Sequence, residues 1–398
     1  MRHLATILVF VLAGVLSAAK GLSADGPRLY GGRTLSEWDD RIKAFSYSSR
    51  EAADAVPALI EIVEDAAVPW ESRRQAALTL GRMGRTAVDA VPVLIRLAGP
   101  SSMEETRLWA LSAIGRFGRL APQAAPVMIS FLNSRGESHL VHMGAAEVLG
   151  QIGPAHPAAI PALIDCVSRL GSHPSEVSSG TDLRVACTDV LSLSGAAASP
   201  AIPLLLRLMR DPSERLRQAA LTTLAAMGPA AEIAALQVAE VLVSDRDELT
   251  RDRAAEALVA MRAEPIVLRL LSFPRPEIRA RIATALSRWP KPPEAVRQAV
   301  AEAAFREGDP SVRGAALWAD WTWTRDRDRL APGALGLLEG QARIARKAGY
   351  RVLREAVPFP LEVESRLESL RGSEDADLRR LADALLRHAK SQEIDAIP

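Results

Sequence analysis

Apolar residues in this chain recur in two alternating arrangements that repeat along most of its length. In the first arrangement large apolar residues lie two, three, five and six positions after a proline, as Leu59, Ile60, Ile62 and Val63 follow Pro57. This spacing places them on one face of a helix, and proline is best tolerated in the first turn. The second arrangement is also helical and stops at a glycine, a residue suited to a left-handed C-cap. Each repeat therefore predicts a pair of helices.

Five copies of this repeat align closely. Their closing glycines are Gly84, Gly118, Gly153, Gly195 and Gly228, at successive spacings of 34, 35, 42 and 33 residues, and an insertion around residues 172–181 accounts for the long one. A fixed period indicates a repeat array and not separate globular domains. Weaker copies continue the register to closing positions at Arg262, Pro290, Thr324, Pro358 or its neighbour, and Lys390. About ten helix pairs are therefore expected.

The second helix of each pair carries a large and a small residue at fixed places. The fourth residue before each glycine is Leu80, Ile114, Leu149, Leu191 and Leu224, and the eighth is Ala76, Ala110, Ala145, Cys187 and Ala220. A large side chain that faces a small one lets two helices approach and bury a shared seam. The pattern predicts an all-α fold, a right-handed α-solenoid.

Three segments carry a resemblance to a known family: DPSERLRQAALTTLAAMG at Asp211–Gly228, RQAALTLGRMG at Arg74–Gly84, and MGAAEVLGQIG at Met143–Gly153. The chain resembles the HEAT-repeat family, and more narrowly the short HEAT-like units found in bilin lyases. The signatures of tetratricopeptide and ankyrin repeats are absent. Residues 29–42 look like the N-terminal lead of exported bacterial HEAT proteins. There Trp38 and Ile42 are expected to cover the open end of the solenoid.

The first nineteen residues read as a secretory signal. Arg2 is followed by the apolar run Leu4–Leu16 and a small-residue cleavage site ahead of Lys20. An uncleaved anchor is the alternative, but thirteen apolar residues fall short of the roughly 20 that span a bilayer. We expect a periplasmic or extracellular protein with no membrane span after cleavage. Its expected parts are a signal peptide at 1–19, a lead and capping helix at 20–48, five regular repeats at 49–228, degenerate repeats at 229–390, and a tail at 391–398.

Charge argues against a nucleic-acid partner, since 49 basic and 48 acidic residues leave a net charge of +1. The basic residues still form a series, because the position eleven before each closing residue is Arg in nine of ten units and His142 in the other. The nine are Arg73, Arg107, Arg184, Arg217, Arg251, Arg279, Arg313, Arg346 and Arg379. The HEAT resemblance implies a structural ladder in which these arginines bond to Asp or to helix-end carbonyls, with Asp211, Asp245 and Asp309 as suitable partners. A continuous basic track for a polyanion is the alternative.

Two groups of residues are candidates for binding a partner. Arg74, Arg82 and Arg116 lie outside the ladder in an arginine-rich stretch, and together with Trp109 they are expected on the concave surface. The other group contains Trp318 and Trp321.

Asp320, beside these two tryptophans, replaces the Leu or Ile of the other units. A carboxylate in a core costs several kcal/mol, as an order of magnitude, unless it is paired or the register slips to expose it. Slippage with end-of-array packing is one interpretation, and an aromatic and acidic site for a sugar or cation is the other.

Cys166 and Cys187 occupy positions whose equivalents in the other repeats should touch. They are expected to lie close enough to form a disulfide after export, and two buried free thiols are the alternative.

No catalytic residues, metal ligands or cofactor site are proposed from the sequence. The pattern favours an exported, non-catalytic and monomeric α-solenoid scaffold that binds a protein partner along its concave surface. The alternatives are a bilin-lyase-like enzyme, and a small-ligand protein that uses the Trp-rich segment. Nucleic-acid binding conflicts with the export signal and the near-zero net charge.

Overall fold

A computed structural model describes residues 27–44, 50–153, 158–170 and 179–395. The expected signal peptide at 1–19 lies outside these residues. The described residues form two compact units, Met1–Arg169 and Leu170–Pro398, and each is treated by itself below. Apart from one isolated bridge between Tyr30 and Arg33, the regular structure of the described residues is helical.

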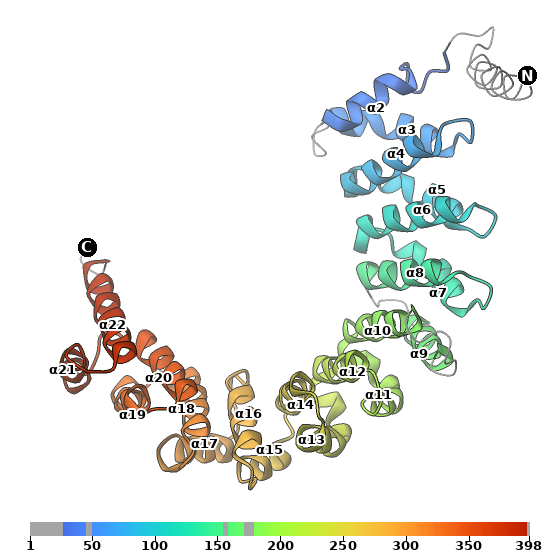
Figure 1. Ribbon diagram of the computed structural model, residues 1–398. Coiled ribbons are helices and arrows are strands. Elements are labelled where there is room, and N and C mark those ends of the chain that lie inside the picture. Colours follow the sequence, from blue (N-terminus) through green and yellow to red (C-terminus); the bar gives the residue numbers. More distant parts are fainter. Residues whose placement is uncertain (1–26, 45–49, 154–157, 171–178, 396–398) are drawn as a thin grey trace, which may run out of the picture. The chain divides into compact units, whose positions relative to one another are not determined.

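The first unit holds a capping helix and successive helix pairs (Figure 1). Its helices are α2 (Leu35–Ala44), α3 (Arg50–Glu64), α4 (Trp70–Met83), α5 (Val91–Ala98), α6 (Glu104–Phe117), α7 (Ala125–Asn133), α8 (His139–Ile152) and α9 (Ala159–Leu170), which reaches the border of the unit. The 3-10 segments η1 (Gly84–Ala90), η2 (Gly118–Leu120) and η3 (Pro122–Ala124) link one pair to the next. Helix α4 contacts α6, and α6 contacts α8, so the second helices form a row.

The second unit begins with α10 (Ser179–Ser192) and continues the same alternation. Its further helices are α11 (Ile202–Leu208), α12 (Glu214–Met227), α13 (Ala235–Ser244), α14 (Glu248–Ala260), α15 (Glu264–Leu271), α16 (Pro276–Leu286), α17 (Glu294–Arg306), α18 (Pro310–Thr324), α19 (Arg327–Glu339), α20 (Arg343–Glu355), α21 (Leu361–Leu370) and α22 (Ala376–Asp395), with η5 (Gly195–Ala201) and η6 (Gly228–Ala234) between pairs. Each even-numbered helix from α10 to α22 contacts the next even-numbered one. We call these seven helices the second-helix row.

The core follows the large-to-small rule of the repeats. All five large residues four before the glycines and all five small residues eight before them are buried, and each of the five glycines adopts a positive φ. Burial of one such Leu or Ile side chain contributes about 1.5–3 kcal/mol. The all-α solenoid fold expected from the sequence is confirmed in each unit.

The repeat pattern misplaces three helix boundaries. Helix α3 begins at Arg50, so Pro57 lies inside it and not in its first turn. Helix α18 ends at Thr324, but the left-handed residue is the next one, Arg325. Helix α22 runs past Lys390 to Asp395, since no glycine or proline lies between Lys390 and Asp395 to stop it.

The capping helix α2 covers the first pair as its apolar residues suggest. Trp38 and Ile42 are buried, α2 contacts α4, and the Trp38 indole Nε1 donates a 2.8 Å hydrogen bond to the Tyr30 carbonyl. The Tyr30 hydroxyl in turn donates to Asp65 over 2.6 Å. Burial and this carboxylate raise the pKa of Tyr30 to about 12.

One described stretch, Glu214–Ser244, is long and apolar enough to cross a membrane by length and composition. The sequence analysis did not anticipate it. It consists of α12, η6 and α13, which belong to two successive helix pairs, and half of its most apolar window is buried inside the protein. Buried core helices of a repeat array satisfy the same criterion.

Candidate protein-binding surface

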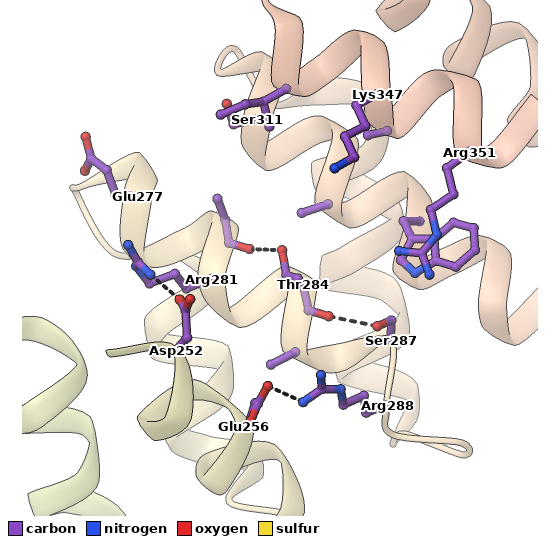
Figure 2. A pocket seen from close by; sticks show the side chains of 17 residues that line it. Asp252, Glu256, Glu277, Arg281, Thr284, Ser287, Arg288, Ser311, Lys347 and Arg351 are labelled. Carbon is purple, nitrogen blue, oxygen red and sulfur yellow. Dashed lines mark hydrogen bonds and ion pairs between the residues drawn. The ribbon is translucent and has the colours of Figure 1, made fainter. Parts of the chain in front are cut away.

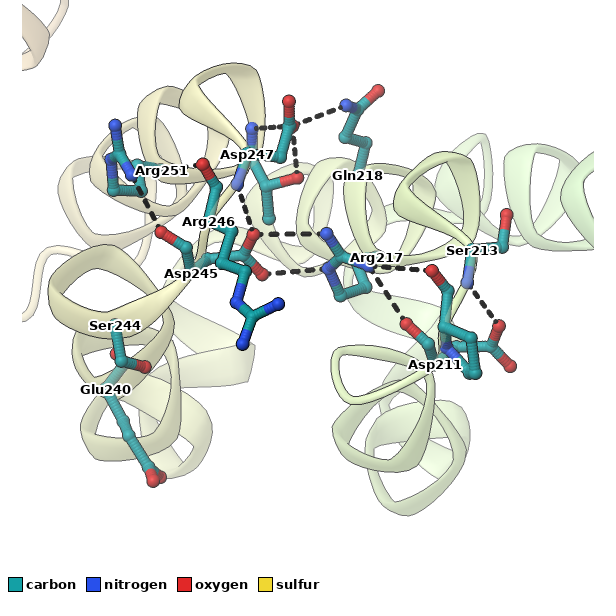
Figure 3. Close-up of polar contacts among 12 residues, drawn as sticks. Asp211, Ser213, Arg217, Gln218, Glu240, Ser244, Asp245, Arg246, Asp247 and Arg251 are labelled. Atoms are coloured by element: carbon teal, nitrogen blue, oxygen red, sulfur yellow. Dashed lines mark hydrogen bonds and ion pairs between the residues drawn. The ribbon is translucent and has the colours of Figure 1, made fainter.

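The arginine series lies at the loops between the first and second helices. In Figure 3, the Arg217 guanidinium donates from Nε and Nη2 to both oxygens of Asp245 at 2.8 and 3.1 Å. Its Nη1 donates to the carbonyls of Asp211 and Pro212. Both side chains are largely buried, and bidentate pairs of this kind hold the two partners in a fixed orientation.

Most of the series uses the same two kinds of partner. A carboxylate 27 to 30 residues later pairs with five of the arginines: Arg107 with Glu137, Arg184 with Asp211, Arg217 with Asp245, Arg279 with Glu307, and Arg346 with Asp375. Arg73, Arg251 and Arg379 donate to loop or helix-end carbonyls, and the His142 ring contacts the Ser134 carbonyl over 2.9 Å. For Arg313 no side-chain hydrogen bond is found among the described residues. These contacts match the structural ladder that the HEAT resemblance implies.

Asp309 is not the acid that pairs with the ladder. Its carboxylate caps α18 by accepting from the main-chain N–H groups of Ser311 and Val312, and Glu307 pairs with Arg279 instead. The HEAT resemblance implied Asp309 as a suitable ladder partner, but a helix N-terminus is the stronger local demand on the Asp309 carboxylate.

The ladder acids predict how stability depends on pH. The hydrogen bond from Arg279 lowers the pKa of Glu307, and the bond from Arg346 lowers the pKa of Asp375. A lowered folded-state pKa contributes stability above the unfolded value and loses it as pH falls through the folded value. We expect the free energy of unfolding to fall below about pH 4.5, and the Glu307→Gln, Asp375→Asn double variant to show a shallower decrease.

Urea unfolding at several pH values between 2 and 6 measures this slope. Glu362→Gln, which alters an exposed carboxylate on α21, is the matched control and should keep the slope of the wild type. An unchanged slope in the double variant would contradict the assignment.

Of the four residues expected to form a binding surface in the first unit, the three arginines are exposed and the tryptophan is not. Arg74, Arg82 and Arg116 are exposed, with Arg82 on α4 and Arg116 on the neighbouring α6. Trp109 is buried at 5% exposure, so its placement on the binding surface was wrong. The centroid of its ring lies 5.8 Å from the guanidinium carbon of Arg73, one of the ladder arginines.

Cys166 on α9 and Cys187 on α10 are both buried. They belong to different units, and the disulfide expected between them stays a prediction.

The tryptophans of α18 differ in their surroundings. Trp321 is buried, and its Nε1 donates to Glu355 over 2.9 Å. Trp318 is half-buried, and the Arg351 guanidinium lies 3.5 Å from its ring centroid. Because Arg351 already occupies the face of Trp318, these residues do not form the open aromatic site that a sugar or cation would need.

Asp320 is buried and paired. Its Oδ1 accepts from Arg329 on α19 over 2.7 Å, and its Oδ2 is buried with no hydrogen-bond partner among the described residues. The expected slippage of α18 is therefore wrong, because the ion pair keeps the carboxylate in the core position. The ion pair with Arg329 lowers the free-energy cost of burying the Asp320 carboxylate, but Oδ2 keeps its share of that cost because it accepts no hydrogen bond from the described residues.

Replacing Asp320 by leucine is expected to raise the free energy of unfolding by about 1 kcal/mol, since it removes an unsatisfied buried oxygen and restores the residue type of the other repeats. Arg329 is about one third exposed and can return to water. Urea unfolding of Asp320→Leu measures the change, with Asp328→Leu at an exposed acid of α19 as control. A loss above about 1 kcal/mol would show that the ion pair stabilises the fold.

A groove of about 680 Å³ crosses the second-helix row from α14 to α20 (Figure 2). Its floor consists of small residues on α16, α18 and α20, among them Ala280, Gly314, Ala315 and Ala348. A Cβ atom added to Gly314 would lie 2.8 Å from the Ala348 Cβ, so α18 and α20 approach closely there. The small side chains leave room above them for a ligand.

The two walls of the groove differ in how their charged side chains are paired. On the α14 and α16 side, Arg281 pairs with Glu248 and Asp252, and Arg288 pairs with Glu256. On the α20 side, Lys347 and Arg351 have no ion pair among the described residues. Figure 2 shows both side chains on α20, facing the groove. The α20 wall therefore carries two cations for which no ion pair is described.

The sequence analysis did not identify this wall. A signal was present, because Arg343, Lys347 and Arg351 are spaced four residues apart in RIARKAGYR and must share one face of a helix. Only Arg346 in this segment belongs to the ladder, and it was the only one considered. Which arginines lack a carboxylate partner depends on neighbouring repeats and not on the segment itself.

Comparison with protein families identifies the repeats. A family model described as HEAT repeats matches residues 92–169, and a second, described as HEAT repeat, matches residues 201–231. The chain contains HEAT repeats over these residues. A search of curated protein sequences finds no match.

Solved structures of HEAT-type solenoids resemble this chain in fold. Yeast importin-β, Kap95p, matches with a TM-score of 0.51 and 12% identity over 90% of this chain and 54% of its own. The karyopherin Kap121p bound to the SUMO protease Ulp1p gives a TM-score of 0.44 at 15% identity, over 98% of this chain and 50% of its own. YibA of E. coli gives 0.40 at 15% identity, over 72% and 97%. The chain spans about half the length of the importin-β structure, and identities this low indicate the fold alone.

Proposed function

We propose that this chain is an exported, non-catalytic scaffold that binds a protein partner along the second-helix row. The observation that carries the proposal is the groove across α14, α16, α18 and α20, with its floor of small residues and charged walls. Contacts that extend over several repeats suit an extended segment of another protein. The karyopherin structure bound to Ulp1p is an example of a HEAT-type solenoid in a protein complex.

Two of the three hydroxyl side chains that line the groove, those of Thr284 and Ser287, support a binding role over a catalytic one. Thr284 Oγ1 donates to the Ala280 carbonyl over 2.8 Å, and Ser287 Oγ donates to the Thr284 carbonyl over 2.8 Å. A nucleophilic hydroxyl needs a base that accepts its proton. Here main-chain carbonyls accept both, as Figure 2 shows. The bilin-lyase alternative therefore gains no support from these groups.

Affinity capture from the exported fraction of the protein's own cells tests the proposal. Ala315→Trp fills the floor of the groove without changing its charge, and it should abolish recovery of a defined partner that wild type retains. Leu268→Trp, at a half-buried position on the first helix α15, is the matched control and should retain the partner. If wild type and both variants recovered equal amounts of the partner, the groove would be excluded as the binding surface.

The export part of the proposal has its own test. N-terminal sequencing of the protein from the exported fraction should begin at Lys20, as the cleavage motif predicts. A protein that keeps Met1 and stays in the cytosol would refute it.

A further inference from the structure

A line of three cations runs along α20 on the groove side of the second unit. Arg343, Lys347 and Arg351 are exposed and recur every fourth residue. At 1.5 Å per residue, the line is about 12 Å long. Like charges four residues apart destabilise a helix by a few tenths of a kcal/mol per pair, so this arrangement has a small cost within the chain itself. We call these three residues the basic stripe.

Several carboxylates near the basic stripe are already engaged. In the loop before α22 and on α22 itself, Asp375 pairs with Arg346, Asp377 with Arg380, and Asp383 with Arg371. Glu355, at the end of α20, accepts from Trp321 and Arg325.

Of the acids on the opposite wall of the groove, one has no ion pair among the described residues. Asp252 and Glu256 on α14 pair with Arg281 and Arg288. Glu277, on α16, is the one acid lining the groove for which no ion pair is described. After internal pairing, the groove therefore presents two cations, Lys347 and Arg351, against this one acid among the described residues, and Arg343 extends the stripe beyond the groove lining.

Trp318 fixes the orientation of Arg351, the last residue of the basic stripe. The Arg351 guanidinium stacks on the Trp318 ring with its carbon 3.5 Å from the ring centroid. Stacking holds the plane of the guanidinium and leaves its N–H edges available, and this fork fits a carboxylate. The stack therefore orients Arg351 for an acidic group that lies over the small-residue floor.

We propose that the basic stripe of Arg343, Lys347 and Arg351 binds an acidic segment of the protein partner, with carboxylates about 6 Å apart. This spacing corresponds to every second residue of an extended chain, since a strand rises about 3.3 Å per residue. The inference rests on the proposed function and adds the chemistry of the partner. Charge complementarity carries it, because no ion pair is described for any of the three cations and the floor beside them is open. Glu355 attracts Arg351, but this carboxylate is itself paired with Arg325.

The test uses a fluorescein-labelled decaglutamate peptide as the probe, with binding to the full chain followed by fluorescence anisotropy. We expect binding that weakens as salt rises, and a loss of at least about tenfold in the Arg343→Glu, Lys347→Glu variant. The neutral Arg343→Gln, Lys347→Gln variant should lose less. Arg207→Glu, Arg269→Glu is the control, since it changes exposed arginines on the first helices α11 and α15.

Two outcomes would overturn the inference. One is unchanged decaglutamate binding in the stripe variant while its circular dichroism melt equals that of the wild type. The other is tighter binding of a ten-nucleotide thymidine oligomer than of decaglutamate, which would make the stripe a phosphate-binding surface. A partner that Ala315→Trp loses but the stripe variant keeps would refute the acidic segment and leave the proposed function standing.

Discussion

Replacing Gly349 by alanine is expected to lower the free energy of unfolding by about 3 kcal/mol. Gly349 lies in α20, where this helix crosses α19 most closely. A Cβ at this position would overlap the Ala334 carbonyl oxygen and would lie 3.0 Å from the Leu338 nitrogen. Both obstacles are main-chain atoms of α19, so no side chain can rotate away and the two helices must separate. Urea unfolding with a fixed slope measures the loss.

Gly336→Ala is the matched control for this change. Gly336 is an exposed residue of the same helix pair, and a Cβ there would meet no atom within 4 Å. Alanine is a better helix former than glycine by about 1 kcal/mol, so this variant should be more stable than wild type. If Gly349→Ala were also neutral or stabilising, the close packing of α19 and α20 would be refuted, and with it the position of the basic stripe.

Replacing Arg217 by methionine is expected to cost about 3 kcal/mol, because it leaves the Asp245 carboxylate largely buried without its partner. Asp245 is 9% exposed at the side chain, and the only other hydrogen bond described for its carboxylate comes from the Asp247 main-chain N–H. The Asp211 and Pro212 carbonyls also lose a donor. Chemical unfolding of the variant, compared with wild type, measures the loss.

Two further variants separate the ladder from a general loss of charge. Arg210→Met removes an arginine whose 3.6 Å pair with Glu240 is mostly exposed, and it should cost no more than about 0.5 kcal/mol. Adding Asp245→Asn to Arg217→Met should recover part of the stability, since the unpaired charge disappears. Equal costs for Arg217→Met and Arg210→Met would contradict a structural ladder and favour the basic-track interpretation of the arginines.

The sequence predicted the parts of the fold that each repeat determines locally. Gly84 and its four equivalents adopt the positive φ expected of a closing residue, and Leu80 and Ala76 are buried as their spacing requires. These features depend on helix periodicity and on a backbone conformation that suits glycine. The ladder arginines were recognisable as a series for the same reason, because their position recurs in every unit.

Features set between repeats were predicted less well. Trp109 was expected on the surface, but it is buried on α6, where its ring lies near the Arg73 guanidinium of α4. Glu307 and not Asp309 pairs with Arg279, because the two acids compete for an arginine and a helix end two residues apart. The basic stripe becomes evident only when the acids of α22 are seen to be paired elsewhere. Charge pairing across repeats cannot be read from the spacing within one repeat.

Site-specific photo-cross-linking tests the central claim that the groove of the second unit holds a protein partner. A photoreactive phenylalanine analogue at Ala315, on the groove floor, is compared in the protein's own cells with the same analogue at Leu268, on a first helix. The account predicts one defined cross-linked protein from position 315 and none from position 268. Cross-linking to the same protein from both positions, or from 268 alone, would contradict it.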